Sequence, residues 1–454
     1  MPFKSINPAT EELIAEYPFI SENDLNLKLD AAYTAFHTWS KTSFVERAKY
    51  ILAVGEDLVK NKAEYGHTMT LEMGKPLKQS IAEVEKCATC CTYYAENAEK
   101  FLSAQTYKTD YSFSEVHFEP LGIIYAIMPW NFPLWQVFRC AVPAIMAGNT
   151  VVLKHAENVP QSALIIQKAF DGAKIPEGVF TNLFITHDQS DQVIIHPGVK
   201  GVSLTGSERA GGHVASLAGI NIKRSVLELG GSDPFIVLAD ADINAAAKTG
   251  CLARMQNNGQ SCIAAKRFIV VKEVAEAFIE KFVAEIGKLK IGNPLKDETY
   301  IGPLARKDLV ETLEKQVHKS VSMGAKILIG GKRIQGKGYY FEPTVLTDIP
   351  KDSPAYKEEL FGSVASVFVV ENEREAINLA NDTVFGLGAS LWTSDHKKAL
   401  EIAPEIQSGS VYINTMVKSD ARIPFGGIKH SGYGRELSDI GIHEFVNIKT
   451  VCIA

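Results

Sequence analysis

The chain has 454 residues, 46% of them hydrophobic and 22% charged, an ordinary globular composition with room for two or three domains. The formal net charge is -6 and there is no block of lysine or arginine, which argues against a nucleic-acid or anionic-membrane partner. The first residues do not resemble a secretion signal, and no apolar run approaches the roughly eighteen residues of a spanning helix, so we expect a cytoplasmic protein.

The first part of the chain is predicted to be helical. Residues 25–91 carry helical periodicity, which is interrupted at residues 72–76, where a glycine closely followed by a proline ends one helix before the next begins. Cys87 and Cys90 have redox or metal spacing, but they lie in a helix-like stretch, residues 81–101, with no second pair and no adjacent histidine. Zinc sites need four ligands, so we expect these thiols to pack in the core and expect no metal site.

From residue 122 onward, short apolar runs alternate with helical segments. Continuous hydrophobicity indicates strands buried on both faces, so the pattern predicts a doubly wound α/β fold with parallel sheets. The predicted strands fall into a first unit and a second unit that begins near Gly230. Those of the first unit are residues 122–128, 150–154, 181–185 and 201–205, and those of the second are 234–238, 267–271, 365–370 and 409–414.

Polar or glycine-containing segments follow three strands of the first unit. They are residues 129–131, residues 154–157 and the pair Gly206-Ser207. Ligands bind beyond the carboxyl ends of such strands, so these segments are candidates for a binding site. Gly206 allows close approach of the backbone to a phosphate at a helix start, although the pattern alone fits an ordinary turn equally well.

One cysteine and one glutamate carry the chemical signal. Cys262 ends the glycine-containing polar segment 256–262, and Glu228 precedes the pair Gly230-Gly231 at the seam between the two units. A free thiol is ordinarily a small buried hydrophobe, but this context indicates exposed backbone. A cysteine nucleophile and a glutamate base suffice to form a thioester and then hydrolyse it. The alternative for Glu228 is a surface or ion-paired carboxylate.

Five motifs in order resemble the aldehyde dehydrogenase family, and the resemblance covers nearly the whole chain. Among members of the family, the short length and residues 425–436 look like the succinate-semialdehyde dehydrogenases. The matching motifs are residues 128–133, 227–231, 258–262, 358–362 and 424–429.

The resemblance implies two doubly wound α/β domains and a small β oligomerisation arm. A Rossmann-type cofactor domain is expected from residues 1–102 and 120–228, and a catalytic domain from residues 229–425. The arm is expected from residues 103–119 and 426–454, and its β-prone, apolar tail would add to a sheet in this chain or another subunit. We therefore expect a homodimer or homotetramer.

The resemblance also implies oxidation of an aldehyde to a carboxylic acid through a thiohemiacetal and a thioester on Cys262, with succinate semialdehyde as the favoured substrate. The Asn131 side-chain amide and the Cys262 backbone N–H would stabilise the negative oxygen, although Asn131 could instead end a turn. Alternative functions are a dehydrogenase of glutarate semialdehyde or aliphatic aldehydes, a coenzyme-A-acylating enzyme, or a non-enzymatic family member.

The resemblance assigns a further set of residues to the cofactor. Among them Lys154 and Glu157 would lie at the adenosine ribose, where the carboxylate accepts hydrogen bonds from the hydroxyls. A 2′-phosphate would meet this carboxylate at a cost of about 4 kcal/mol for charges roughly 4 Å apart at an effective dielectric of about 20, so we predict NAD rather than NADP. The whole set is Ile127, Met128, Pro129, Trp130, Lys154, Glu157, Gly206, Ser207, Leu229, Glu359 and Phe361.

Substrate selection is predicted from Arg139 and Ser419. Arg139 lies in a mostly apolar stretch, residues 132–142, and a guanidinium buried there needs an anionic partner. The partner is either the carboxylate of a semialdehyde or a protein carboxylate in a structural ion pair. Ser419 matches the family position that assists this arginine, whereas Gln256 stands where some relatives have a second arginine.

Overall fold

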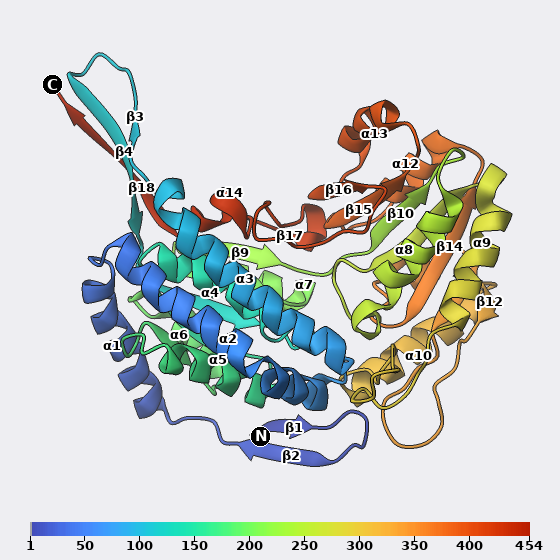
Figure 1. Ribbon diagram of the computed structural model, residues 1–454, viewed down its shortest axis with the longest axis horizontal. Coiled ribbons are helices and arrows are strands. Elements are labelled where there is room, and N and C mark those ends of the chain that lie inside the picture. Colours follow the sequence, from blue (N-terminus) through green and yellow to red (C-terminus); the bar gives the residue numbers. More distant parts are fainter. Residues whose placement is uncertain (1) are drawn as a thin grey trace.

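The computed structural model describes residues 2–454, which form two α/β lobes and a projecting β arm (Figure 1). The first lobe lies on the left of Figure 1 and the second on the right. An N-terminal hairpin of β1 (Phe3–Ile6) and β2 (Leu13–Tyr17) touches both lobes, because Lys4 N–H donates to the Glu157 carbonyl and Tyr339 N–H donates to the Pro8 carbonyl.

A six-stranded sheet forms the centre of the first lobe, in the order β17-β9-β8-β5-β6-β7. Neighbouring strands are parallel except that β17 runs antiparallel to β9. The central strands are buried on both faces, as their continuous hydrophobicity predicts. The strands are β5 (Ile123–Met128), β6 (Thr150–His155), β7 (Phe180–Asn182), β8 (Val199–Thr205), β9 (Arg224–Glu228) and β17 (Gly432–Tyr433).

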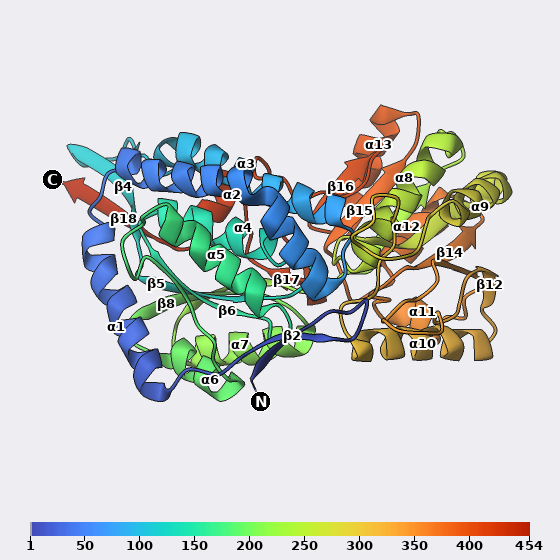
Figure 2. The ribbon, with the colours of Figure 1, turned by 60° about the horizontal axis from the view of Figure 1, so that its bottom comes forward.

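Helices cover both faces of this sheet (Figure 2). One face packs against α2 (Phe44–Met73), α3 (Leu77–Phe101), α4 (Trp135–Met146) and α5 (Pro160–Gly172). The other face packs against α1 (Glu22–Trp39), α6 (His187–Ile195) and α7 (Glu208–Ile220). The helix break predicted at residues 72–76 is confirmed, since Gly74 ends α2 with a φ of 79° and Pro76 precedes α3.

The second lobe contains a seven-stranded sheet in the order β12-β13-β14-β11-β10-β15-β16, parallel except for the β12–β13 pair. Its strands are β10 (Asp233–Val237), β11 (Ala265–Val271), β12 (Lys326–Ile329), β13 (Thr344–Thr347), β14 (Val364–Val370), β15 (Gly388–Trp392) and β16 (Ser410–Ile413). Its helices are α8 (Ile243–Met255), α9 (Lys272–Gly287), α10 (Lys307–Ser322), α11 (Pro354–Lys357), α12 (Glu373–Asn381) and α13 (His396–Ile402).

The arm is a three-stranded antiparallel sheet that projects from the first lobe and carries the C-terminus at its tip (Figure 1). Its strands are β3 (Gln105–Thr106), β4 (Phe113–Pro120) and β18 (Val446–Ile453). The predicted tail strand thus pairs along its full length with β4 of the same chain. Earlier parts of the segment assigned to the arm lie with the first lobe, namely β17 in its sheet and α14 (Ser438–Ile442) against α3.

The α/β fold with parallel sheets is confirmed, although individual strands differ from their predicted bounds. The run at residues 181–185 forms only β7, because the chain then leaves the sheet and Thr186 caps α6. The two main sheets also contain β9, β12, β13, β15 and β17, which the sequence pattern did not predict. Strands β9 and β15 contain charged or small residues that weaken the apolar pattern, and β12, β13 and β17 have four residues or fewer. None of the helices within residues 2–454 is long and apolar enough to cross a membrane.

The clustered cysteines of α3 lie in the core of the first lobe. Cys87, Cys90 and Cys91 are fully buried and belong to the hydrophobic cluster between the helices and the sheet. Burial raises the pKa of each thiol. Across the described chain, no group of three or more histidine, cysteine or acidic residues is placed to hold a metal ion.

Candidate active site

Cys262 lies in the connection from α8 to β11, where the backbone takes an unusual path. Asn257 and Asn258 each have a φ of 56°, and Gly259 has a φ of 72°. Asparagine tolerates this left-handed conformation better than most residues, and glycine adopts it freely. A Cβ at Gly259 would lie 2.2 Å from the Gly362 carbonyl oxygen, so only glycine fits. The prediction of exposed backbone was wrong for these three residues. They are buried because the turn packs between the loop after β5 and the loop before β14.

Buried hydrogen bonds fix the turn before Cys262. Asn257 Nδ2 donates to the carbonyl oxygens of Asn131 (2.8 Å) and Gln260 (2.9 Å). Arg254, which is fully buried at the end of α8, donates to the Leu360 carbonyl at 2.8 Å. These bonds tie the cysteine loop to the loop after β5 and to the loop before β14. Residues from distant parts of the sequence therefore hold the sulfur-bearing segment in place.

Two cavities meet at the side chain of Cys262. The larger cavity has a volume of about 420 Å³ and the smaller about 200 Å³, and Cys262 and Gln136 line both. Arg139 and Ser419 line the larger cavity. The smaller cavity is lined by Pro129, Trp130, Asn131, Gly206, Ser207, Leu229, Glu359 and Phe361, all of them predicted site residues. The arrangement offers one compartment for a substrate and one for a cofactor, with a thiol where the two meet.

The Cys262 thiol is neutral at physiological pH, because burial raises its pKa to about 11. The positive charges of Arg139 and Lys266 lower this pKa, whereas the carboxylates of Glu359 and Glu228 raise it. Only a thiolate attacks a carbonyl carbon efficiently. A Cys262 that acts as a nucleophile would therefore have to lose this proton first.

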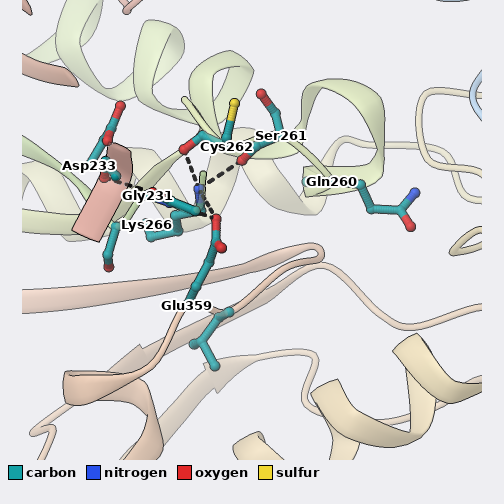
Figure 3. Close-up of polar contacts among 12 residues, drawn as sticks. Gly231, Asp233, Gln260, Ser261, Cys262, Lys266 and Glu359 are labelled. Atoms are coloured by element: carbon teal, nitrogen blue, oxygen red, sulfur yellow. Dashed lines mark hydrogen bonds and ion pairs between the residues drawn. The ribbon is translucent and has the colours of Figure 1, made fainter. Parts of the chain in front are cut away.

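Lys266, the second residue of β11, contacts the backbone of the cysteine loop. Its buried ammonium donates to the carbonyl oxygens of Ser261 (2.7 Å) and Cys262 (2.6 Å) and pairs with Glu359 at 2.9 Å (Figure 3). Figure 3 also shows the Cys262 sulfur pointing away from this ammonium. Lys266 thus fixes the Cys262 backbone and the Glu359 carboxylate, and it acts on the sulfur only through its charge.

The two predicted oxyanion donors lie on neighbouring loops. Asn131 is buried after β5, and its Nδ2 donates to the Gln260 carbonyl at 3.2 Å, which uses one of its two N–H groups. Within residues 2–454, the backbone N–H of Cys262 donates to no other backbone group. Both residues line the smaller cavity. One N–H of each is therefore available to an oxygen bound near the sulfur.

Glu228 ends β9 at the seam of the lobes and is almost completely buried. Neither carboxyl oxygen has a hydrogen-bond partner or an ion-pair partner within the described residues. Burial raises the pKa of Glu228 well above its ordinary value, Arg139 opposes this shift, and Glu436 adds to it. A Cβ on Gly426 would lie 2.8 Å from Oε1 of Glu228, so this glycine leaves room for the carboxylate. The surface and ion-pair alternatives for Glu228 both fail.

Arg139 has the structural ion pair that the sequence left open as an alternative. Its Nε pairs with Oε2 of Glu436, and its Nη2 donates to Oγ1 of Thr205 at 3.1 Å. The guanidinium also lies 4.8 Å from the centre of the Phe425 ring. Arg139 is almost fully buried yet lines the larger cavity. Its charge is therefore largely neutralised by the protein itself.

Ser419 receives two hydrogen bonds at the wall of the larger cavity. Trp135 Nε1 and Lys86 Nζ both donate to its Oγ, each at 2.8 Å. All three residues line the larger cavity. The structure thus places Ser419 beside a lysine that the sequence did not single out.

Four predicted cofactor residues lie outside both cavities. Ile127 and Met128 are the last residues of β5 and position the loop that follows. Lys154 is buried near the end of β6, and burial lowers its pKa while Glu157 opposes that shift. The Glu157 side chain is 45% exposed, with one carboxyl oxygen 3.6 Å from Nε2 of His187.

Four residues at the site were missed by sequence reasoning: Lys86, Gln136, Lys266 and Glu436. The sequence signal for Lys266 is a lysine four residues after the cysteine, at the start of an apolar strand. Glu436 lies in a segment quoted for the resemblance, but nothing local indicates that its partner is Arg139. Lys86 and Gln136 lie on helices with no chemical signal of their own.

Comparisons with known proteins show what the chain is similar to. The sequence signature of the aldehyde dehydrogenase family matches residues 1–451. A Synechocystis sp. protein named a probable succinate-semialdehyde dehydrogenase (NADP+) is 48% identical over the full length of both chains. Succinate-semialdehyde dehydrogenase (NADP+) 1 of Mycobacterium tuberculosis is 46% identical, also over both full chains. The crystal structure of succinic semialdehyde dehydrogenase from Streptococcus pyogenes in complex with NADP+ matches with a TM-score of 0.98 and 37% identity over 99% of each chain.

The prediction of NAD over NADP was wrong, because these relatives are named for NADP+ and the S. pyogenes structure contains it. The predicted repulsion between Glu157 and a 2′-phosphate was overestimated for a physical reason. Glu157 is half-exposed, and water and salt screen a charge there far more than an effective dielectric of about 20 assumes. Lys154, which attracts the same carboxylate, also offsets its charge.

Proposed function

Since the chain belongs to the aldehyde dehydrogenase family, we propose that it oxidises succinate semialdehyde to succinate with NADP+ as the electron acceptor. The names of its relatives support both the substrate and the cofactor. The observation that carries the proposal is that Cys262 lines two cavities, one for each reactant.

The lining of the smaller cavity supports binding of part of a dinucleotide. Gly206 and Ser207 stand before α7, where the positive end of the helix favours an anionic phosphate. Trp130 and Phe361 form an edge-to-face pair with centroids 5.7 Å apart, which gives the cavity an aromatic wall. When bound there, NADP+ supplies the acceptor for the hydride that leaves the aldehyde carbon.

Cys262 starts the reaction once its thiol proton has passed to solvent water. The thiolate attacks the aldehyde carbon, and the carbonyl electrons move to the oxygen, which gains a negative charge. The side-chain amide of Asn131 and the backbone N–H of Cys262 stabilise this oxygen, and a donor of this kind lowers the barrier by roughly 3–4 kcal/mol. Departure of the hydride with its electron pair then restores the carbonyl as a thioester on the sulfur.

Glu228 completes the cycle by accepting a proton. Its unpartnered carboxylate takes a proton from water, which attacks the thioester carbon. The sulfur–carbon bond breaks, succinate is released, and the thiolate is regenerated. A raised pKa suits this role, because a carboxylate with a higher pKa is a stronger base.

The larger cavity receives the substrate. Arg139 and Ser419 line it and are candidates to bind the carboxylate at the far end of a semialdehyde. Trp135, Phe132 and Phe425 give the rest of the wall an apolar character that suits a short methylene chain.

The oligomeric state and a cytoplasmic location stay predictions. The paired strands β4 and β18 of the arm are the expected oligomer contact.

The test is a set of steady-state assays in which the reduced dinucleotide is measured. We expect the highest kcat/KM with succinate semialdehyde and NADP+. Glutarate semialdehyde and unsubstituted aliphatic aldehydes test the alternative substrates. A requirement for coenzyme A would indicate the acylating reaction, and no turnover with any aldehyde would indicate a non-enzymatic member. Either of those results, or a plain aldehyde as the best substrate, would overturn the proposal.

A further inference from the structure

Lys86 is a partly buried cation of the larger cavity, and no carboxylate of the described residues forms an ion pair with it. It lies on α3, partly buried, and within residues 2–454 it has no acidic group at ion-pair distance. Arg139 is paired with Glu436, and the acidic residue of the cavity wall, Asp420, is already paired with Arg422 at 2.6 Å. A partly buried ammonium without a counter-ion is costly unless a ligand supplies one.

The contact between Lys86 and Ser419 makes the Ser419 hydroxyl a hydrogen-bond donor toward the cavity. Ser419 Oγ accepts from Lys86 Nζ and from Trp135 Nε1, both at 2.8 Å. A hydroxyl has two lone pairs and one O–H, so these two bonds use its acceptor capacity and leave the O–H to donate. The remaining ammonium hydrogens of Lys86 are also donors. The group formed by Lys86, Ser419 and Trp135, here called the donor cluster, therefore offers hydrogens only.

The donor cluster is held in a fixed geometry. Lys86 Nζ lies 3.9 Å from the centre of the Trp135 ring, a distance at which the ring face attracts a cation. Burial lowers the pKa of Lys86 to about 8, so the ammonium is still charged at neutral pH. An entering carboxylate would gain charge-assisted hydrogen bonds without having to order these side chains first.

We propose that Lys86, acting with Ser419, binds the distal carboxylate of the substrate and makes the enzyme select aldehydes that carry one. This assignment rests on the proposed function and deepens it. The cation that binds the substrate carboxylate is then Lys86 on α3. Arg139 is not that cation, because its guanidinium already has a carboxylate partner. The substrate class is a short-chain aldehyde with a carboxylate at its other end.

The experiment compares kcat/KM for succinate semialdehyde and for butanal, which has four carbons but no carboxylate. Lys86→Met and Lys86→Gln should each lower the ratio of the two values by roughly 10- to 100-fold, the range for one hydrogen bond to a charged group. Activity with butanal should stay close to that of the parent enzyme, which also shows that the variants fold. Inhibition of butanal oxidation by succinate should weaken in the same two variants.

Two matched lysines serve as comparisons. Lys100→Met makes the same change on an exposed position of the same helix, and the ratio should not change. Lys418→Met removes the other lysine of the cavity wall, which is exposed. A fall in the ratio of kcat/KM values that occurs only in this variant would overturn the assignment. An unchanged ratio in both Lys86 variants would overturn it as well. A parent enzyme that does not prefer succinate semialdehyde over butanal would instead refute the proposed function, and the assignment with it.

Discussion

Lys266 and Glu359 form an ion pair beside the backbone of the cysteine loop, with 2.9 Å between Nζ and Oε1. The same ammonium donates to the Cys262 carbonyl, so the pair couples the nucleophile's backbone to a carboxylate of the smaller cavity (Figure 3). Lys266 lowers the pKa of the Cys262 thiol, and Glu359 raises it. The two partners therefore act on the nucleophile in opposite directions.

Removing one partner at a time should shift thiol reactivity in opposite directions. Lys266→Met should slow alkylation of Cys262 at a fixed pH by roughly 2- to 10-fold, and Glu359→Gln should accelerate it by a similar factor. The rate is measured as loss of activity with iodoacetamide. Shifts of the same sign in both variants would contradict the electrostatic role of the pair.

The pH dependence of the same alkylation follows from the raised pKa of Cys262. Below a pKa of about 11 the thiolate fraction rises with pH, so the rate should increase about tenfold per unit between roughly pH 7 and pH 9. A plateau in that interval would show a thiol with a much lower pKa. Cys452→Ala is the control, because it removes the exposed cysteine that would also react.

Cys262→Ala should abolish aldehyde oxidation while NADP+ still binds. Its methyl group cannot form the covalent bond that the mechanism requires, so kcat should fall by at least about 1000-fold. Binding can be followed by tryptophan fluorescence, since Trp130 lines the smaller cavity. The exposed Cys452→Ala should retain full activity, and persistent turnover in Cys262→Ala would refute covalent catalysis.

Glu228→Gln should slow the second half of the reaction more than the first. The amide cannot accept the proton of the attacking water, so kcat should fall by roughly 100-fold or more. The thioester should accumulate, which appears as a rapid burst of reduced cofactor of about one equivalent per site. Slow turnover without a burst would place Glu228 before the hydride step instead.

Glu436→Gln should destabilise the protein by leaving Arg139 buried without a counter-ion. Breaking such a buried pair costs about 3–5 kcal/mol of unfolding free energy, which denaturant titration can measure. The exposed surface pair of Arg374 and Glu405 is the matched comparison, and Glu405→Gln should change stability far less than Glu436→Gln does. Equal effects of the two substitutions would show that the buried pair is not structural.

The sequence by itself determined the architecture and pointed to Cys262 as the candidate nucleophile. Periodicity predicted the α/β fold because long helices and doubly buried strands leave a local signature that tertiary contacts only reinforce. The motifs that contain Cys262 and Glu228 could be recognised in the sequence because each includes glycines that the fold requires. A Cβ on Gly259 would lie 2.2 Å from the Gly362 carbonyl oxygen, and one on Gly231 would lie 2.6 Å from the Cys262 carbonyl oxygen, so only glycine fits at these positions close in sequence to Cys262 and Glu228.

Only the tertiary structure decided how the charges of the site are paired. Arg139 meets Glu436, and Lys86 meets Ser419 across 333 residues of sequence, in contacts that no local pattern encodes. The repulsion expected from Glu157 also depended on its exposure, which sequence does not give. The reason is physical: the strength of an electrostatic interaction depends on distance, burial and the nearest opposite charge, and folding sets all three.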